Sequence, residues 1–138
     1  REALDIRIGI RDFARLWSAI FTINESVATM LRQLKPQYRL LCLSNTNPWH
    51  FAWCLERYPA LQLFERFILS YEERCCKPDT RIYLSVLRQA GEPAGSCLYI
   101  DDRLENVQAA QNLGMQAVQF TGVAALRAYL RDSGIPGL

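Results

Sequence analysis

Two adjacent carboxylates, Asp101 and Asp102, follow the short apolar run from Cys97 to Ile100. A Gly-Ser turn precedes this run and a helical pattern begins just beyond the acids, so we expect a buried strand here. The carboxyl end of such a strand is where α/β sheets bind ligands. Paired acids are costly unless a cation or hydrogen-bond donors compensate them, and a hard cation such as Mg²⁺ takes oxygen ligands. The alternative is that one Asp caps the next helix and the other is solvated.

Two further polar groups follow other predicted strands. Ser44-Asn45-Thr46 comes directly after the apolar run 39–43, and Lys77-Pro78 comes after a strand at 67–70 and a polar loop. Singly, the first is typical of a turn and the second of a solvated loop. At one edge of one sheet, the three groups would offer a hydroxyl, an ammonium and a metal-binding acid pair. Those are the groups that hold a phosphoryl group.

The elements that must position these groups follow from the apolar pattern. Strands near 39–43, 67–70, 97–101 and 115–120 alternate with helical segments, which predicts an α/β fold with a mostly parallel sheet. The strands are continuous apolar runs, as expected when helices cover both faces of a sheet. Upstream, apolar residues spaced by three and four predict a helix over 11–21 and another from the Asn24 cap to Pro36.

The composition excludes several classes of protein. The chain has 138 residues, 50% hydrophobic residues and a net charge of +2, which is ordinary for one globular domain. Its arginines form no basic stripe, so we expect no nucleic-acid partner. No run reaches membrane-spanning length and the N-terminus has no signal-peptide pattern, so we expect no membrane partner either.

The five cysteines predict free thiols in a reducing cytoplasm, because their number is odd and no Cys-x-x-Cys spacing occurs. A single histidine makes a zinc site improbable. Cys75 or Cys76 could be a reactive thiol, because the neighbouring cation Lys77 would lower its pKa. Packed or inert thiols are the favoured interpretation.

These motifs together resemble the haloacid dehalogenase-like (HAD) superfamily of hydrolases, over nearly the whole chain. The resemblance rests on a series of segments in the family's order, namely Leu43–Asn47, Tyr58-Pro59, Lys77–Asp79 with Ile82-Tyr83, Tyr99–Asp102, Glu105–Val107, Ala109-Ala110 and Leu113-Gly114. It is greatest for the bacterial subgroup typified by α-D-glucose-1-phosphate phosphatases, whose Ser-Asn-Thr-Asn-x-x-His pattern is met through His50. The resemblance implies a three-layer α/β/α Rossmann-like core. It also implies a Mg²⁺-dependent phosphatase of small phosphorylated metabolites, with sugar phosphates as candidates.

The resemblance also implies roles for single residues. Ser44 would hydrogen-bond the phosphoryl oxygens, and Asn45 would help to orient the substrate or the nucleophile. Lys77 would pair with a nucleophilic Asp and the transferring phosphoryl group. His50 and Asn47 could touch substrate, although helix capping and packing are favoured for both.

The same resemblance assigns the metal to the acid pair. Aligning Asn106-Val107 with the family pattern makes Asp102 the direct Mg²⁺ ligand. Asp101 would then act through a water molecule or by contacting the residues that bind the metal.

The chain departs from the family in one large respect. HAD enzymes carry Asp-x-Asp at the end of their first strand, where the first Asp attacks phosphorus, and no two acids in this chain are spaced by one residue. The resemblance begins inside the cap, so we expect 1–22 to be the C-terminal part of a helical cap and 23–138 the core. In the family's strand order, 3-2-1-4-5, the missing strand would leave Leu40–Leu43 and Leu98–Ile100 with unpaired edges. Either a segment not represented here, which is favoured, or another chain or a rearranged strand would fill the gap.

Four functional interpretations follow. The leading one is a Mg²⁺-dependent HAD-like phosphatase whose nucleophile lies outside this sequence, so whether the chain alone is an enzyme stays open. The alternative is a catalytically inactive, truncated HAD-like protein that acts by binding or oligomerisation. A phosphoacceptor receiver domain would place its acid pair first in the chain rather than last. A dehalogenase proper needs no metal, and Asp102 favours a phosphatase over it.

Overall fold

The computed structural model describes residues 8–135 of the chain, which form an α/β domain. All four predicted strands are present, each four residues long. The helices and strands in chain order are α1 (Ile10–Ser18), α2 (Glu25–Leu34), β1 (Leu41–Ser44), α3 (Pro48–Arg57), β2 (Arg66–Leu69), α4 (Ser70–Glu73), α5 (Thr80–Ala90), β3 (Leu98–Asp101), α6 (Leu104–Gln111), β4 (Gln116–Gln119) and α7 (Val123–Asp132). Two 3₁₀ helices, η1 (Pro59–Leu63) and η2 (Ala94–Ser96), complete the described part.

The strands form two separate parallel pairs rather than one sheet. β1 pairs with β2, with Leu41 opposite Arg66, and β3 pairs with β4, with Leu98 opposite Gln116. Within residues 8–135, no ladder joins β1 to β3. The expected interruption between these two strands is therefore a feature of the structure.

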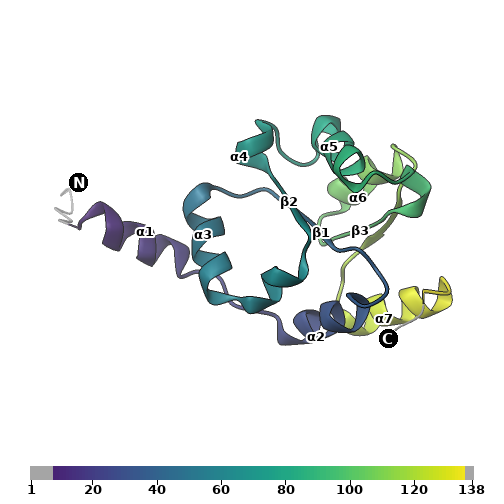
Figure 1. Cartoon of the computed structure of the whole chain (residues 1–138), viewed down its shortest axis with the longest axis horizontal. Coiled ribbons are helices and arrows are strands. Elements are labelled where there is room, and N and C mark those ends of the chain that lie inside the picture. Colours follow the sequence, from purple (N-terminus) through teal and green to yellow (C-terminus); the bar gives the residue numbers. More distant parts are fainter. Residues whose placement is uncertain (1–7, 136–138) are drawn as a thin grey trace, which may run out of the picture.

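Helices cover the strands on both sides and create two apolar clusters (Figure 1). One cluster lies against α5 and α6 and includes Ile82 and Tyr83, both fully buried, with Leu41 and Leu43 of β1 packed against it. The other lies between α2 and α7, and Leu98 of β3 packs against it. Three layers, helix, strand and helix, thus enclose the strands, as the apolar runs predicted.

Local signals in the sequence set several helix ends. The Asn24 side chain accepts a hydrogen bond from Val27 N at 3.2 Å, and Asn47 accepts from Trp49 N and His50 N at 3.0 Å each. These are N-caps, which satisfy backbone donors left free in the first turn. Gly91 ends α5 with φ 68°, a left-handed conformation that suits glycine.

The structure differs from the predicted elements in two places. The first helix ends at Ser18 rather than near Phe21, and a short helix, α4, begins at Ser70 where the sequence suggested the end of a strand and then a loop. α1 packs against α3 through Trp17, whose ring lies 4.6 Å from that of His50. Its other apolar residues stay open to solvent, with Leu16 66% exposed and Ile20 beyond the helix 65% exposed.

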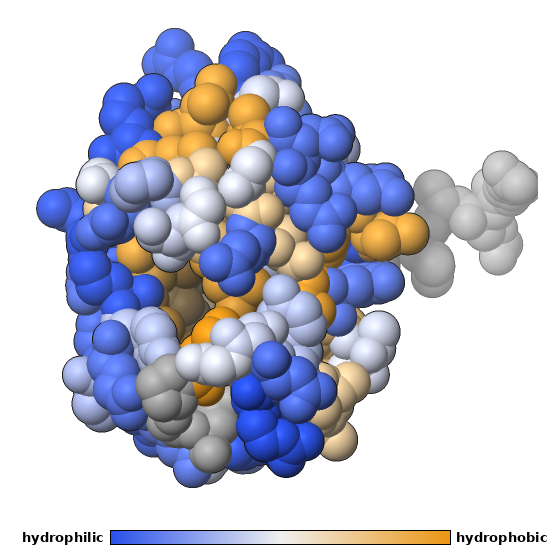
Figure 2. Space-filling model, turned by 90° about the vertical axis from the view of Figure 1, so that its right-hand side faces the viewer, coloured by the Kyte–Doolittle hydropathy of each residue, from blue (hydrophilic) through white to orange (hydrophobic). Residues whose placement is uncertain are grey.

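Seen from the side opposite α1, the surface is polar at its margins and apolar in between (Figure 2). The apolar surface is hollowed near its centre. Among residues 8–135, no helix combines the length and the apolar character that crossing a membrane requires.

Candidate functional site

The loop before α5 brings Lys77 to the carboxyl ends of β1 and β3. Lys77 Nζ donates to Asp101 Oδ2 at 2.7 Å and to the Leu43 carbonyl oxygen at 3.2 Å. The two charged side chains are largely buried, at 13% and 5% exposure. One ammonium group therefore ties together the two halves of the interrupted sheet, at the edge predicted from the sequence.

Asp101 accepts a full set of hydrogen bonds. Its Oδ2 accepts from Lys77 Nζ and from Tyr99 OH at 2.6 Å. Its Oδ1 accepts from Arg103 N and Asn106 Nδ2, each at 2.9 Å. A carboxylate offers about four acceptor positions, and these four donors occupy them in this structure.

These donors determine the charge state of Asp101. Burial raises the pKa of the carboxyl group, but the hydrogen bonds from Lys77, Tyr99, Arg103 and Asn106 outweigh burial and hold the pKa at about 2. Burial and the neighbouring Asp101 both raise the pKa of Tyr99, so its hydroxyl remains a donor at all ordinary pH values. Asp101 is thus an anion at neutral pH that neutralises and orients Lys77.

Asn45 fixes the backbone of Lys77 rather than pointing freely from the strand end. Its Oδ1 accepts from Lys77 N at 2.8 Å, and its Nδ2 donates to Lys77 O at 3.0 Å. The oxygen and the nitrogen of the Asn45 amide therefore both bond to the backbone of Lys77. Asn45 is therefore a positioning residue for the Lys77 loop in this structure.

The rest of the loop after β1 is held by the start of α4. Ser70 Oγ accepts from Thr46 N and donates to Thr46 O, both at 3.0 Å. Ser44, the last residue of β1, is half-buried at the same strand end as the Lys77 ammonium group. The structure thus brings Ser44, Asn45, Lys77 and Asp101 to one edge.

Asp102 differs from its neighbour in exposure. Its side chain is exposed, and its backbone oxygen accepts from Gln119 Nε2 at 2.8 Å. In the described part of the chain, no three His, Cys, Asp or Glu side chains gather as a metal site would require. Asp102 is thus the exposed carboxylate of the pair, and a single carboxylate supplies only part of the oxygen ligands that Mg²⁺ takes.

Asn47 and His50 serve the helix that follows β1. Asn47 caps α3, and the His50 ring packs between Trp17 and Phe21, with ring centroids 4.6 and 5.0 Å away. His50 Nε2 is buried and has no hydrogen-bond partner among residues 8–135. The structure therefore places His50 in the contact between α3 and the segment that contains α1.

Sequence reasoning did not identify Tyr99 and Asn106 as members of the site. Tyr99 lies two residues before Asp101, so both side chains point to the same face of β3. Asn106 lies in the first turn of α6, is 3% exposed, and its own carbonyl oxygen accepts from Tyr83 OH at 3.1 Å. The two-residue spacing in the strand was the available signal for Tyr99.

All five cysteines are free. Burial raises the pKa of Cys42 to about 11, even with Lys77 nearby to lower it. Burial also raises the pKa of Cys54 and Cys97. These three thiols are therefore poor nucleophiles at neutral pH.

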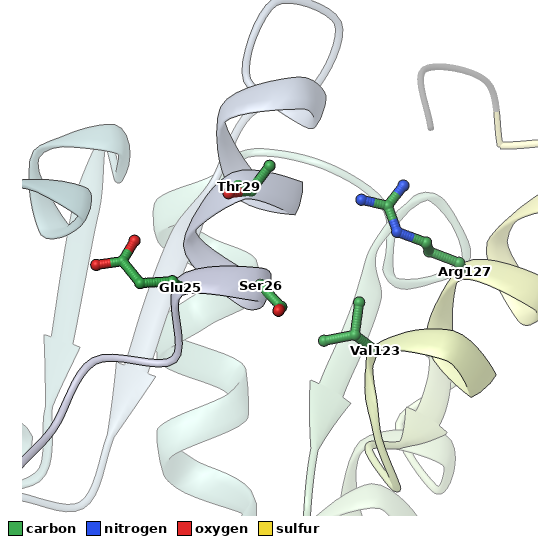
Figure 3. A pocket seen from close by; sticks show the side chains of 5 residues that line it. All are labelled: Glu25, Ser26, Thr29, Val123 and Arg127. Carbon is green, nitrogen blue, oxygen red and sulfur yellow. The ribbon is translucent and has the colours of Figure 1, made fainter.

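A pocket of about 310 Å³ lies between α2 and α7 rather than at Lys77. Glu25, Ser26 and Thr29 line it from α2, and Val123 and Arg127 line it from α7. Figure 3 shows Ser26 and Val123 pointing toward each other across this space. The lining residues lie in the first two turns of the two helices, on the helical layer opposite α5 and α6.

Comparison with known proteins identifies a family for this chain. The profile of the haloacid dehalogenase-like hydrolases matches residues 4–114. The sesquiterpene phosphatase astK of Aspergillus oryzae is 33% identical over 107 residues, which cover 77% of this chain and 55% of that protein. The N-acylneuraminate-9-phosphatase of Homo sapiens is 29% identical over 97 residues, covering 70% of this chain and 39% of that protein.

A solved structure has a similar fold. The crystal structure of HAD family enzyme bt-2542 from Bacteroides thetaiotaomicron, in complex with magnesium and inorganic phosphate, is similar with a TM-score of 0.75 and 27% identity. That likeness covers 83% of this chain and 61% of that one. The match thus spans between 39% and 61% of the length of these three proteins. It belongs to the haloacid dehalogenase-like hydrolase family.

Proposed function

We propose that the edge formed by Ser44, Lys77 and the acid pair is the phosphoryl-binding part of a phosphatase of small phosphorylated metabolites. The observation that carries the proposal is the buried pair of Lys77 and Asp101, 2.7 Å apart, at the carboxyl ends of two parallel strands. Two of the three ammonium hydrogens bind Asp101 and Leu43 O, so the third is available to a phosphoryl oxygen. The related phosphatases support the same class of substrate.

The proposal gives each residue a separate task. Ser44 donates its hydroxyl to the phosphoryl group, and Lys77 supplies positive charge where negative charge is densest. Asn45 and Asp101 position Lys77, the first through its backbone and the second through its ammonium group. His50 supports α3 rather than substrate, since its ring lies among Trp17 and Phe21.

The proposal includes a Mg²⁺ ion bound by Asp102. The exposed carboxylate can hold the ion together with phosphate oxygens and waters, which is how Mg²⁺ is commonly bound. The bound ion would neutralise charge on the phosphoryl group. The magnesium and phosphate complex of the related bt-2542 enzyme supports this role.

The sequence contains no Asp-x-Asp, so the proposal takes the nucleophilic carboxylate from outside these 138 residues. We also propose residues 1–22 as part of a cap, and the five free thiols fit a reducing compartment such as the cytoplasm. The second candidate, an inactive protein that acts by binding, rests on the same missing motif. An Asp-x-Asp encoded upstream of Arg1 would exclude that candidate.

The experiment measures binding of inorganic phosphate to the 138-residue chain in the presence of MgCl₂ by calorimetry. Lys77→Met should weaken binding about tenfold, because a charge-assisted hydrogen bond is lost. Lys35→Met is the matched control, since Lys35 also precedes a proline but pairs with Glu65 away from the site. Equal affinities for the Lys77 and Lys35 variants would contradict the proposal.

A second measurement tests the need for an outside nucleophile. The 138-residue chain should not hydrolyse p-nitrophenyl phosphate with Mg²⁺, because the carboxylate that would form the aspartyl-phosphate is not part of this sequence. Turnover by the pure chain that disappears in Asp102→Ala would show that the described residues suffice.

A further inference from the structure

Asp102 lies between two peptide groups that are both held by hydrogen bonds. The group before it contains Asp101 O, which accepts from Phe120 N of the β4 side at 2.7 Å. The group after it joins Asp102 to Arg103. Its N–H, on Arg103, donates to Asp101 Oδ1 at 2.9 Å, and its oxygen, on Asp102, accepts from Gln119 Nε2 at 2.8 Å. Peptide groups are planar, so these contacts fix both planes that flank the Asp102 Cα atom.

The two planes determine the direction in which the Asp102 side chain leaves the backbone. A residue has only two soft backbone angles, φ and ψ, and each flanking plane sets one of them. Asp102 is exposed, so packing against its side chain does little to hold that direction. The hydrogen bonds to the neighbouring peptide groups are therefore the main constraint on where the Asp102 carboxylate can reach.

Gln119 holds one of these planes through its side chain. It is paired with Asp101 in the register of β3 and β4, and each of the two is the last residue of its strand. The Gln119 side chain reaches past the strand end to Asp102 O. A carbonyl oxygen only accepts hydrogen bonds, so the nitrogen of the Gln119 amide must be the atom that faces it.

Two other glutamines make contacts of the same kind around β4. Gln116 Nε2 donates to Gly95 O at 2.9 Å, and Gln111 Nε2 donates to Ala117 O at 3.1 Å. Gln116 and Gln119 are the first and last residues of β4, and both are exposed. These other contacts join β4 to η2 and α6 without involving the acid pair. Gln119 differs from them in the peptide group that it holds.

That peptide group also connects Asp102 to the Lys77 ammonium group. Its N–H donates to one oxygen of Asp101, and the other oxygen of Asp101 accepts from Lys77 Nζ at 2.7 Å. Rotation of the plane would remove one of the four donors that hold the Asp101 carboxylate. The contact from Gln119 therefore stabilises both carboxylates of the pair, one through its backbone and one through its donor.

We propose that Gln119 is a positioning residue for a divalent cation, because it fixes the peptide group between Asp102 and Arg103 and so holds the Asp102 carboxylate in place to bind the ion. A carboxylate that is ordered before binding loses less conformational entropy when the ion arrives. This inference rests on the proposed function, in which Asp102 binds Mg²⁺.

The test uses the isotope-labelled 138-residue chain in solution and Mn²⁺ as a paramagnetic substitute for Mg²⁺. Bound Mn²⁺ broadens the NMR signals of nearby amides, so a titration locates the ion and measures its affinity. In the wild-type chain the Arg103 amide should broaden first, and Asp102→Asn should abolish this effect. Gln119→Met keeps the side-chain length but has no donor. It should weaken Mn²⁺ binding about fivefold, because one hydrogen bond of modest net strength is lost.

Gln116→Met is the matched control, since it removes a hydrogen bond of the same kind from the other end of β4. Urea unfolding should give similar midpoints for the two variants, whereas only Gln119→Met should weaken Mn²⁺ binding. Hydrogen exchange at the Arg103 amide should also accelerate in Gln119→Met alone, because the peptide group is then held at one end only. A purely structural role for Gln119 would not separate the two variants in this way.

Equal Mn²⁺ affinities for the wild-type chain and Gln119→Met would overturn the inference and leave the cation site at Asp102 intact. Equal weakening in Gln119→Met and Gln116→Met would also overturn it, since any lost contact of β4 would then suffice. A wild-type Arg103 signal that does not respond to Mn²⁺ would refute the proposed Mg²⁺ site and this inference with it. If Gln119→Met does not fold, Gln119→Thr must give the same loss of affinity, because threonine suits a strand and is too short to reach Asp102 O.

Discussion

Asp101 is the residue on which the candidate site depends, because four donors converge on its carboxylate. The hydrogen bonds are made to the ionised form, and they hold the pKa at about 2, below the ordinary value of 3.8. A carboxyl group whose pKa is depressed by folding stabilises the folded state above its unfolded pKa. That stabilisation is lost as the pH falls from about 4 through 2.

We expect this residue to contribute about 2 kcal/mol to the free energy of unfolding at neutral pH. Urea unfolding measured from pH 6 to pH 2 should show this contribution disappearing below pH 4. Asp101→Asn should lose that part of the pH dependence. It should also be destabilised at pH 7, since it leaves the Lys77 ammonium group buried without its partner. An unchanged pH profile in the variant would show that Asp101 is not the titrating group.

A second prediction at this scale concerns Asn45. Asn45→Ala removes both hydrogen bonds to the Lys77 backbone and should lower the free energy of unfolding by about 1–3 kcal/mol. Hydrogen exchange at the Lys77 amide should accelerate, because its acceptor is gone. Asn112→Ala, at an exposed position after α6, is the control and should change neither quantity.

The residue roles show what the amino-acid order could and could not predict. The strand ends that carry Ser44 and Asp101 were predictable, because apolar runs followed by polar residues mark the carboxyl ends of buried strands. The contacts that single residues make within the site were not predictable. Asn45 bonds to a residue 32 positions away, and only the folded loop brings the two together. His50 lies against Trp17 because α1 turns back on α3, a contact no spacing predicts.

At the scale of elements, local signals were more informative. Asn24, Asn47 and Gly91 mark helix ends where the structure has them, because caps depend on neighbours along the chain. The end of the first helix was wrong by about three residues, since apolar spacing continues past Ser18 although the helix does not. The α4 turn was missed because it is only four residues long.

Gly91 provides a test of one such end. Its φ of 68° is costly for any residue with a Cβ, so Gly91→Ala should lower the free energy of unfolding by about 1 kcal/mol. No atom lies within 4 Å of the added Cβ, so the cost is conformational rather than steric. Gly95→Ala is the control, because Gly95 lies outside the left-handed region and its Cβ would meet only Gly114 O at 4.0 Å. Equal thermal midpoints for the two variants would contradict this account.

At the scale of the whole molecule, apolar surface is concentrated on the segment that contains α1. Ile10, Leu16 and Ile20 are each about two-thirds exposed, and Phe13 and Trp17 are also exposed. Contiguous apolar surface of this kind commonly marks a contact with another protein. The domain thus has two incomplete regions, the interrupted sheet and this helix.

We therefore expect the 138-residue chain to associate at micromolar concentration, measured by size-exclusion chromatography with light scattering. Leu16→Glu should shift the chain toward monomer, because it places a charge in the centre of the α1 surface. Leu84→Glu is the control, since Leu84 is 45% exposed on α5, away from α1. A monomeric wild-type chain with cooperative unfolding would contradict this prediction.

The pairing of Lys77 with Asp101 has a practical consequence for anyone who studies the protein in solution. The chain contains two lysines, Lys35 and Lys77, and both precede a proline. Lys35 is 33% exposed in its side chain, whereas Lys77 is 13% exposed and its amine is occupied by Asp101 and Leu43 O. A mild acylating reagent should modify Lys35 first. Mass spectrometry can measure the ratio of modified Lys77 to modified Lys35, with Lys35 as the internal reference. A low ratio would indicate that Lys77 still holds the two halves of the sheet together.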